Sequence, residues 1–238
     1  AVQQHIFGIF MRNRTVCETC KFVADDVGEI QNMFLVNMQD VCARREDEVD
    51  MQQLLRRQIR CVEYVDGACP AHTHLSEAER RAQNACRGRA AKYTFWDRLP
   101  PVFFVTVTRA FGPDPDDQRY DRRRVRFPQV LTPEEDGCDY EFSGVVVHVP
   151  GDAEQPSVHG GHYVAYGVVG ENQYACFNDS TTRNLSWRDF AHSEQVQRGA
   201  YVFAYVRSAG ARAHEVGRAA GSAGSAGSGS GGGGAASS

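Results

Sequence analysis

Apolar residues recur in the second half of the chain in the short alternating or continuous runs that are typical of β-strands. These runs are rich in Val, Phe and Tyr, and they span 93–97, 102–109, 124–127, 140–149, 162–169, 172–178 and 200–207. The pattern predicts a sheet in this half of the chain. We find no internal repeat.

The first half of the chain carries helical periodicity. Five apolar side chains between 40 and 62 fall on one helical face: Met51, Leu54, Leu55, Ile59 and Val62. Acidic residues 46–48 begin this segment and arginines end it, the order that the helix dipole favours. Ser76–Glu79 has the pattern of a capping box, which predicts a short helix through about 86. A further short helix is expected over 186–196.

The candidate chemistry lies in two neighbouring strands of the predicted sheet. Gly161-His162-Tyr163 begins one strand, and Phe177-Asn178-Asp179-Ser180 ends the next. A two-residue loop at Gly170-Glu171 would place His162 directly opposite Asp179, and a loop one residue longer or shorter would still bring Asn178 or Asp179 within one position. Cross-strand side chains of one face lie about 4.5–5.5 Å apart at Cβ. An amide or carboxylate could therefore hold one imidazole nitrogen while the other accepts a proton from a thiol.

These motifs, together with Cys17-Glu-Thr-Cys20, resemble the ubiquitin-specific protease family. Further matches in the right order cover most of 7–207, and they include Phe7-Gly8, Leu99-Pro100 with the strand to Arg109, Phe127-Pro128, Tyr140 to His148 and Gly199 to Tyr205. The resemblance implies an α+β fold of the papain-like cysteine peptidase type. It would have an antiparallel β palm (about 96–207), a zinc-knuckle fingers extension (about 7–95), a few short helices, and a thumb that is missing or incomplete.

The resemblance also implies an activity, which is thiol-dependent hydrolysis of the (iso)peptide bond after the C-terminal glycine of ubiquitin. His162 would act as the general base, Asn178 would orient its ring, and Asp179 would support the same network. Gly160, Gly161 and Tyr163 are the implied substrate-binding residues, the glycines because they allow close backbone approach. The alternatives are an Asx-stabilised strand end for Asn178 and Asp179, and a plain turn for the glycines.

A structural zinc site is implied by the paired cysteines. Cys17 and Cys20 supply two ligands, and Cys69-Pro-Ala-His72 follows at the family's spacing, so the expected set is Cys17, Cys20, Cys69 and His72. His74, Cys61 and Cys86 remain substitutes for the last position. The alternative is that the second pair has decayed and the metal has been lost.

A nucleophile is the part of the family pattern that we do not find. Family members carry an Asn-Thr-Cys type motif before the zinc knuckle, and nothing in 1–16 resembles it. Cys176 and Cys138 do not lie at a helix start, where a thiolate would be stabilised. We therefore expect the chain to be the C-terminal part of a catalytic domain and to be inactive alone. The rival interpretation is a non-enzymatic ubiquitin-binding or scaffold module, and a third is an unrelated zinc-bound interaction domain.

Composition limits the classes of partner and the cellular compartments that the chain suits. The net charge of −4 argues against nucleic acid as a main partner. The sequence contains no run of about 18 apolar residues, so no membrane span is predicted. Most of the eight cysteines lack a disulfide-like arrangement, which favours the reducing cytoplasm or nucleus. Residues 208–238, rich in Gly, Ser and Ala, are expected to form a disordered tail. Five residues are interpreted as packing or surface positions: Tyr64, Trp96, His148, His159 and His192.

Overall fold

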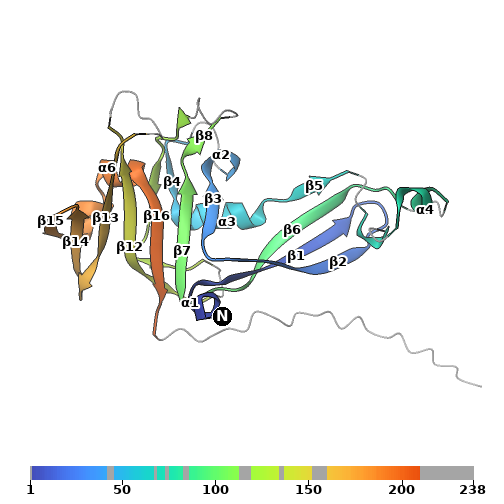
Figure 1. Cartoon of the computed structure of the whole chain (residues 1–238), viewed down its shortest axis with the longest axis horizontal. Helices are drawn as coiled ribbons and strands as arrows, with labels where there is room; N and C mark the ends of the chain where they lie inside the picture. The colour runs from blue at the N-terminus through green and yellow to red at the C-terminus, as the bar shows by residue number, and fades with distance from the viewer. Residues whose placement is uncertain are drawn as a thin grey trace, which may run out of the picture.

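Two larger sheets, one at each end of the molecule, organise the chain (Figure 1). The computed structural model describes residues 2–41, 46–66, 69–72, 75–82, 86–112, 119–133, 137–151 and 160–209. We call the eight-stranded sheet the palm and the four-stranded sheet the fingers.

The palm has the strand order β15-β14-β13-β12-β16-β7-β3, with β11 paired to β12. Its strands are β3 (Phe34–Asn37), β7 (Val102–Thr108), β11 (Val130–Leu131), β12 (Tyr140–Val149), β13 (His162–Gly170), β14 (Gln173–Asn178), β15 (Thr181–Leu185) and β16 (Ala200–Arg207). Neighbouring strands are antiparallel except β3 and β7, which run parallel. The antiparallel palm expected from the sequence is therefore confirmed.

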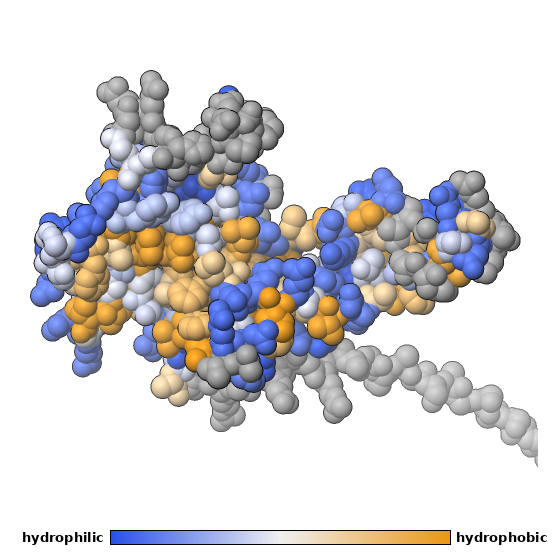
Figure 2. Space-filling view, viewed as in Figure 1, coloured by the Kyte–Doolittle hydropathy of each residue, from blue (hydrophilic) through white to orange (hydrophobic). Residues whose placement is uncertain are grey.

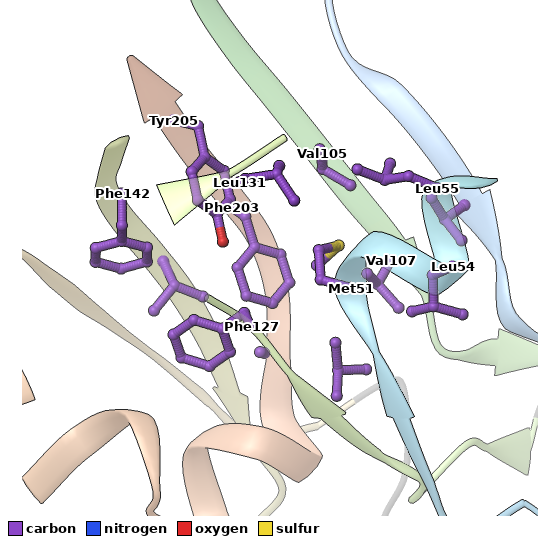
Figure 3. Packing of buried hydrophobic residues seen from close by; sticks show 14 of the residues in the cluster. Met51, Leu54, Leu55, Val105, Val107, Phe127, Leu131, Phe142, Phe203 and Tyr205 are labelled. Atoms are coloured by element: carbon purple, nitrogen blue, oxygen red, sulfur yellow. The ribbon is translucent and has the colours of Figure 1, made fainter. Parts of the chain in front are cut away.

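One face of the palm is buried beneath helices. Alternate side chains of the central strands, among them Val105, Phe203 and Tyr205, are fully buried on this face. Helix α3 (Met51–Arg60) packs its apolar side on them, as Figure 3 shows for Met51, Leu54 and Leu55. Helices α5 (Trp187–Ala191) and α6 (Glu194–Gly199) cover the part beside β13 and β14, where Phe190 contacts the rings of Tyr166 and Tyr174.

On the opposite face of the palm, the described helix that packs on the central strands is the short α1 (Val2–Phe7), whose Phe7 ring contacts Phe104 of β7. Hydrophobic side chains gather there (Figure 2). Leu35, Tyr163, Phe177 and Val206 are among the large hydrophobic residues that remain exposed.

The segment predicted as one helix over 40–62 is divided in the structure. It contains the end of α2 (Met38–Val41), strand β4 (Glu48–Asp50) and α3. Strand β4 pairs in parallel with β10 (Arg124–Arg126) and buries Val49. Asp50 then caps α3, because its carboxylate accepts the backbone N–H groups of Gln52 and Gln53.

The other two helix predictions hold in part. The capping box of Ser76 and Glu79 is present and begins α4 (Glu77–Ala82). The single helix expected over 186–196 is instead the pair α5 and α6, because α5 ends at a cap on His192 and Ser193 starts the next helix.

The fingers contain β1 (Ile9–Cys17), β2 (Val23–Gln31), β5 (Glu63–Val65) and β6 (Ala90–Arg98), in the order β2-β1-β6-β5. Helix α1 (Val2–Phe7) precedes them, and the 3₁₀ turn Pro70–His72 and α4 lie at the far end (Figure 1). The apolar pattern of the sequence predicts β6 only in part and does not predict β1, β2 or β5.

A short hairpin, β8 (Ala110–Phe111) with β9 (Arg119–Tyr120), completes the strands. No helix in the described part of the chain is long and apolar enough to cross a bilayer.

Candidate active site and metal centre

His162 and Asn178 meet at the end of the β13–β14 hairpin. The Nε2 atom of His162 lies 2.6 Å from Oδ1 of Asn178. Since an amide oxygen only accepts, Nε2 must carry the proton in this contact. A neutral imidazole then keeps Nδ1 unprotonated, so this nitrogen has the lone pair that a general base needs.

The hairpin reaches this geometry with a register one position away from the expected one. The turn is Glu171-Asn172, because Gly170 pairs with Gln173, and a bulge lies between Val168 and Gly170. Asn172 accommodates the turn with a positive φ of 53°. His162 is therefore not directly opposite Asp179, although Asn178 remains within hydrogen-bonding reach.

Asp179 lies close to the same nitrogen without a hydrogen bond. Its Oδ2 atom is 3.7 Å from Nε2 of His162, and its side chain is 80% exposed. Asp179 has a positive φ of 49° in the turn that leads to β15. The carboxylate can thus stabilise a protonated imidazole by charge, while Asn178 sets the orientation of the ring.

The backbone before His162 is glycine for a steric reason. Gly161 has a φ of 134°, and a Cβ atom there would lie 2.5 Å from the carbonyl oxygen of Val149. Among the described residues, a Cβ atom at Gly160 would meet nothing within 4 Å. Tyr163 follows on the outer face and is 57% exposed. Gly160, Gly161 and Tyr163 therefore lie together beside His162.

His162 and Asn178 also line a cavity of about 380 Å³, together with Cys176, Arg183 and Gln195. The Cys176 thiol does not reach the imidazole, since Cys176 pairs with Tyr166, four residues and about 13 Å along β13 from His162. Cys138 precedes the start of β12, whereas His162 pairs with Val149 at the end of that strand. Neither thiol that the sequence singles out is adjacent to His162.

Four cysteines converge at the far end of the fingers. The sulfur atoms of Cys17, Cys20, Cys69 and Cys86 all lie within 4.8 Å of one another. The Cys17–Cys86 and Cys20–Cys69 separations are 3.6 and 3.5 Å. Tetrahedral zinc with Zn–S bonds of about 2.3 Å places its sulfur ligands about 3.8 Å apart, so the cluster fits this ion.

The fourth member of the cluster differs from the expected ligand set. Cys86, one of the substitutes, joins Cys17, Cys20 and Cys69, and His72 is not among them. The reason is the pairing of β1 with β6, which sets Cys17 opposite Ala90 and so brings the preceding segment back to the first knuckle. His74 lies outside the described residues.

The surroundings of the cluster favour thiolates in part. The backbone N–H of Cys20 lowers the pKa of the Cys17 thiol to about 6. The N–H of Gly88, 3.4 Å from the sulfur of Cys86, acts in the same direction, but burial and the neighbouring thiols leave the pKa of Cys86 above its ordinary value. Burial raises the pKa of the Cys69 thiol to about 12 when no cation is present. A bound divalent cation would offset that cost, because it favours deprotonated sulfur ligands.

Comparison with known proteins identifies the family. The family model described as ubiquitin carboxyl-terminal hydrolase matches residues 1–205. The chain belongs to this family. The resemblance seen in the sequence is thereby confirmed. No curated protein sequence matches the chain.

Solved structures agree on the fold of this hydrolase family member. A chain of the Ubp8-Sgf11-Sgf73-Sus1 SAGA DUB module has a TM-score of 0.61 at 17% identity, and the match covers 87% of this chain and 41% of that chain. A chain of yeast SAGA DUBm with an Sgf73 mutant gives 0.61 at 19% identity, covering 87% and 42%. The fold is therefore of the expected α+β, papain-like type. The chain spans about two fifths of the length of the structures it matches.

Proposed function

We propose that this chain supplies the histidine side and the ubiquitin-binding surface of a cysteine-type deubiquitinase. The observation that carries the proposal is the 2.6 Å contact between His162 Nε2 and Asn178 Oδ1 in a member of this hydrolase family. The contact leaves Nδ1 of a neutral ring available to a thiol. In this proposal His162, Asn178 and Asp179 are the catalytic residues.

The chemistry follows from these roles. His162 takes the proton from a cysteine thiol, and the thiolate attacks the carbonyl carbon of the C-terminal glycine of ubiquitin. The protonated ring then gives its proton to the departing amine, leaving a thioester. Water hydrolyses the thioester with His162 again as the base. Asp179, 3.7 Å from Nε2, stabilises the ring while it is charged.

The exposed glycines and the fingers are proposed to bind ubiquitin. Gly160 and Gly161 leave room for a peptide backbone, and Tyr163 forms the adjoining wall. Zinc held by Cys17, Cys20, Cys69 and Cys86 would fix the end of the fingers. With four protein ligands such an ion has no open position, so its part is structural. A site of four thiolates suits the reducing cytoplasm or nucleus.

The nucleophile is proposed to lie outside the described residues, because Cys176 and Cys138 are too far along their strands from His162. The chain alone should therefore bind ubiquitin and hydrolyse a fluorogenic ubiquitin substrate negligibly. Robust turnover that is abolished by Cys176→Ala would contradict this assignment.

The catalytic roles are tested on the complete protein. The native transcript is read upstream of the codon for Ala1, and any in-frame segment is expressed with the chain. If it brings a cysteine motif at a helix start, His162→Ala should lower kcat/KM about 10²–10⁴-fold, the usual contribution of general acid–base catalysis. An unchanged kcat/KM would refute the role of His162.

A non-catalytic ubiquitin-binding module is the second candidate, and the distance of both thiols from His162 is the observation that favours it. A start or stop codon directly before Ala1 would support this alternative. If the isolated chain does not bind ubiquitin, both candidate functions are contradicted.

A further inference from the structure

His148 is a buried histidine directed at the glycine backbone that precedes His162. It occupies the penultimate position of β12 and is 5% exposed. Its Nε2 atom lies 3.1 Å from the carbonyl oxygen of Gly160. Because a carbonyl only accepts, Nε2 carries the ring proton in this contact. From the sequence alone, this residue is interpreted as a packing or surface position.

Two tyrosines hold the imidazole of His148 in place. Its ring centroid lies 5.6 Å from that of Tyr120 and 5.0 Å from that of Tyr163. Tyr120 is itself anchored, since its hydroxyl donates to the carbonyl of Arg198 at 3.3 Å. Burial raises the pKa of Tyr120, so the hydroxyl keeps its proton. The direction of the His148 donor is therefore fixed by its neighbours.

The ring of His148 also occupies the space that a side chain at Gly161 would need. A Cβ atom at Gly161 would lie 2.6 Å from Nε2 of His148, whereas one at Gly160 would meet no atom of the described residues within 4 Å. One side of this dipeptide thus rests on His148, and both glycines are exposed. In a trans peptide the C=O and the following N–H point in opposite directions. Holding the Gly160 carbonyl therefore turns the Gly161 N–H away from His148.

We propose that His148 is a positioning residue that holds the Gly160–Gly161 backbone in the shape that receives the C-terminal tail of ubiquitin beside His162. The inference rests on the proposed function, because the ligand it names is the ubiquitin tail. The Gly161 N–H is the donor offered to a carbonyl of that tail. His148 acts through the two glycines and does not touch the reacting atoms.

The hold on the backbone can be measured without ubiquitin. Two variants of the ¹⁵N-labelled chain are compared by NMR: His148→Leu, which lacks a donor, and His148→Gln, which keeps an N–H donor. His192→Leu, at an exposed helix end, is the matched control. The amide signals of Gly161 and His162 should shift in His148→Leu and lie closer to wild type in His148→Gln. Unchanged signals in His148→Leu would overturn the proposal.

The role in binding is measured with two probes, ubiquitin and ubiquitin lacking its last two glycines. The wild-type chain should bind complete ubiquitin more tightly than shortened ubiquitin. His148→Leu should reduce that preference about 3- to 10-fold, the effect of one hydrogen bond. It should leave the affinity for shortened ubiquitin unchanged, and His148→Gln should restore most of the preference. A merely structural role would weaken both probes equally, which would overturn the inference.

The two proposals fail in different ways. If wild type binds neither form of ubiquitin, the proposed function fails, and with it the assignment of the tail as ligand. If wild type prefers complete ubiquitin and His148→Leu keeps that preference in full, the role of His148 is refuted while the proposed function stands.

Discussion

Arg109 offers the sharpest test of how the palm is held together around the candidate site. This arginine follows β7 and is 1% exposed. Its guanidinium donates to four backbone carbonyl oxygens, at 2.8 Å to Ala200, 2.7 Å to Gln197, 3.0 Å to Asp121 and 2.8 Å to Arg123. Burial lowers its pKa to about 10, so the group stays charged at neutral pH. One side chain thereby joins the α6–β16 junction to the segment after β9.

The substitution Arg109→Met keeps much of the side-chain volume and removes every N–H donor of the guanidinium group. A buried carbonyl left without a partner costs about 1–3 kcal/mol, so four of them cost at least about 4 kcal/mol. We therefore expect a loss of about 4 kcal/mol, out of the roughly 5–15 kcal/mol that stabilises a typical domain.

Urea unfolding of the chain with zinc in the buffer, followed by tryptophan fluorescence, measures this loss. The chain has two tryptophans, Trp96 at the base of the fingers and Trp187 in α5, so both parts are observed. With a slope of about 2 kcal/mol per M, the midpoint should fall by about 2 M. Arg14→Met is the matched control, because Arg14 pairs with Asp25 at the surface and should leave the midpoint nearly unchanged. Equal midpoints for the two variants would refute the reasoning.

Three further predictions concern zinc binding by the cysteine cluster, the conformation of Gly161, and the pH dependence of stability. Cys86→Ser should abolish stoichiometric zinc binding in native mass spectrometry and His72→Ala should not, because Cys86 belongs to the sulfur cluster and His72 does not. The reverse result would contradict this set of ligands. Gly161→Ala should destabilise the chain by about 1–3 kcal/mol in thermal melts, because alanine is strained at this positive φ. Gly160→Ala should be close to wild type, and equal losses of stability in the two variants would contradict this prediction. Although burial opposes its ionisation, hydrogen bonds from the arginine two residues on hold the pKa of Asp121 below its ordinary value. The unfolded chain therefore binds more protons, and the stabilisation present above about pH 4 is lost as the pH falls through the folded pKa. Asp121→Asn should thus lower the urea midpoint at pH 7 more than at pH 3, and an equal effect would disprove the linkage.

The palm could be predicted from the sequence because burial on one face imposes a period of two. Strand β12 spans Tyr140–Val149 and β16 ends at Arg207, as the apolar pattern indicates. The alternate positions Phe203 and Tyr205 are fully buried, so the signal comes from the core itself.

The fingers were expected from the family resemblance, but most of their strands escaped prediction from the apolar pattern, and two of them, β2 and β5, have no buried side chain. Strand β2 contains Asp25 and Asp26 together with Val27, which is 83% exposed. Its pairing with β1 is supported by surface contacts such as the Arg14–Asp25 ion pair. Alternation of apolar and polar residues reports burial, so a strand exposed on both faces gives little signal.

The fourth cysteine of the sulfur cluster was hidden for a different reason. A CxxC or CxxH spacing describes one knuckle, which the chain closes locally. Cys86 reaches Cys17 through long-range pairing, since it lies four residues before Ala90, the partner of Cys17 in the β1–β6 ladder. Neither β1 nor its register with β6 was predicted, so the sequence could keep Cys86 only as a substitute.

The candidate dyad survived an error in register because strand alternation, more than exact pairing, selects the residue that meets His162. Asn178 lies on the same side of β14 as Cys176, and both line the cavity that His162 also lines. Asp179 is the first residue of the turn, where its positive φ and 80% exposed side chain leave it 3.7 Å from Nε2. The arrangement divides two tasks between neighbours. In the proposed mechanism, the neutral amide would orient the imidazole without placing a full negative charge in contact with it, and the solvated carboxylate would stabilise the charge that forms when His162 takes a proton.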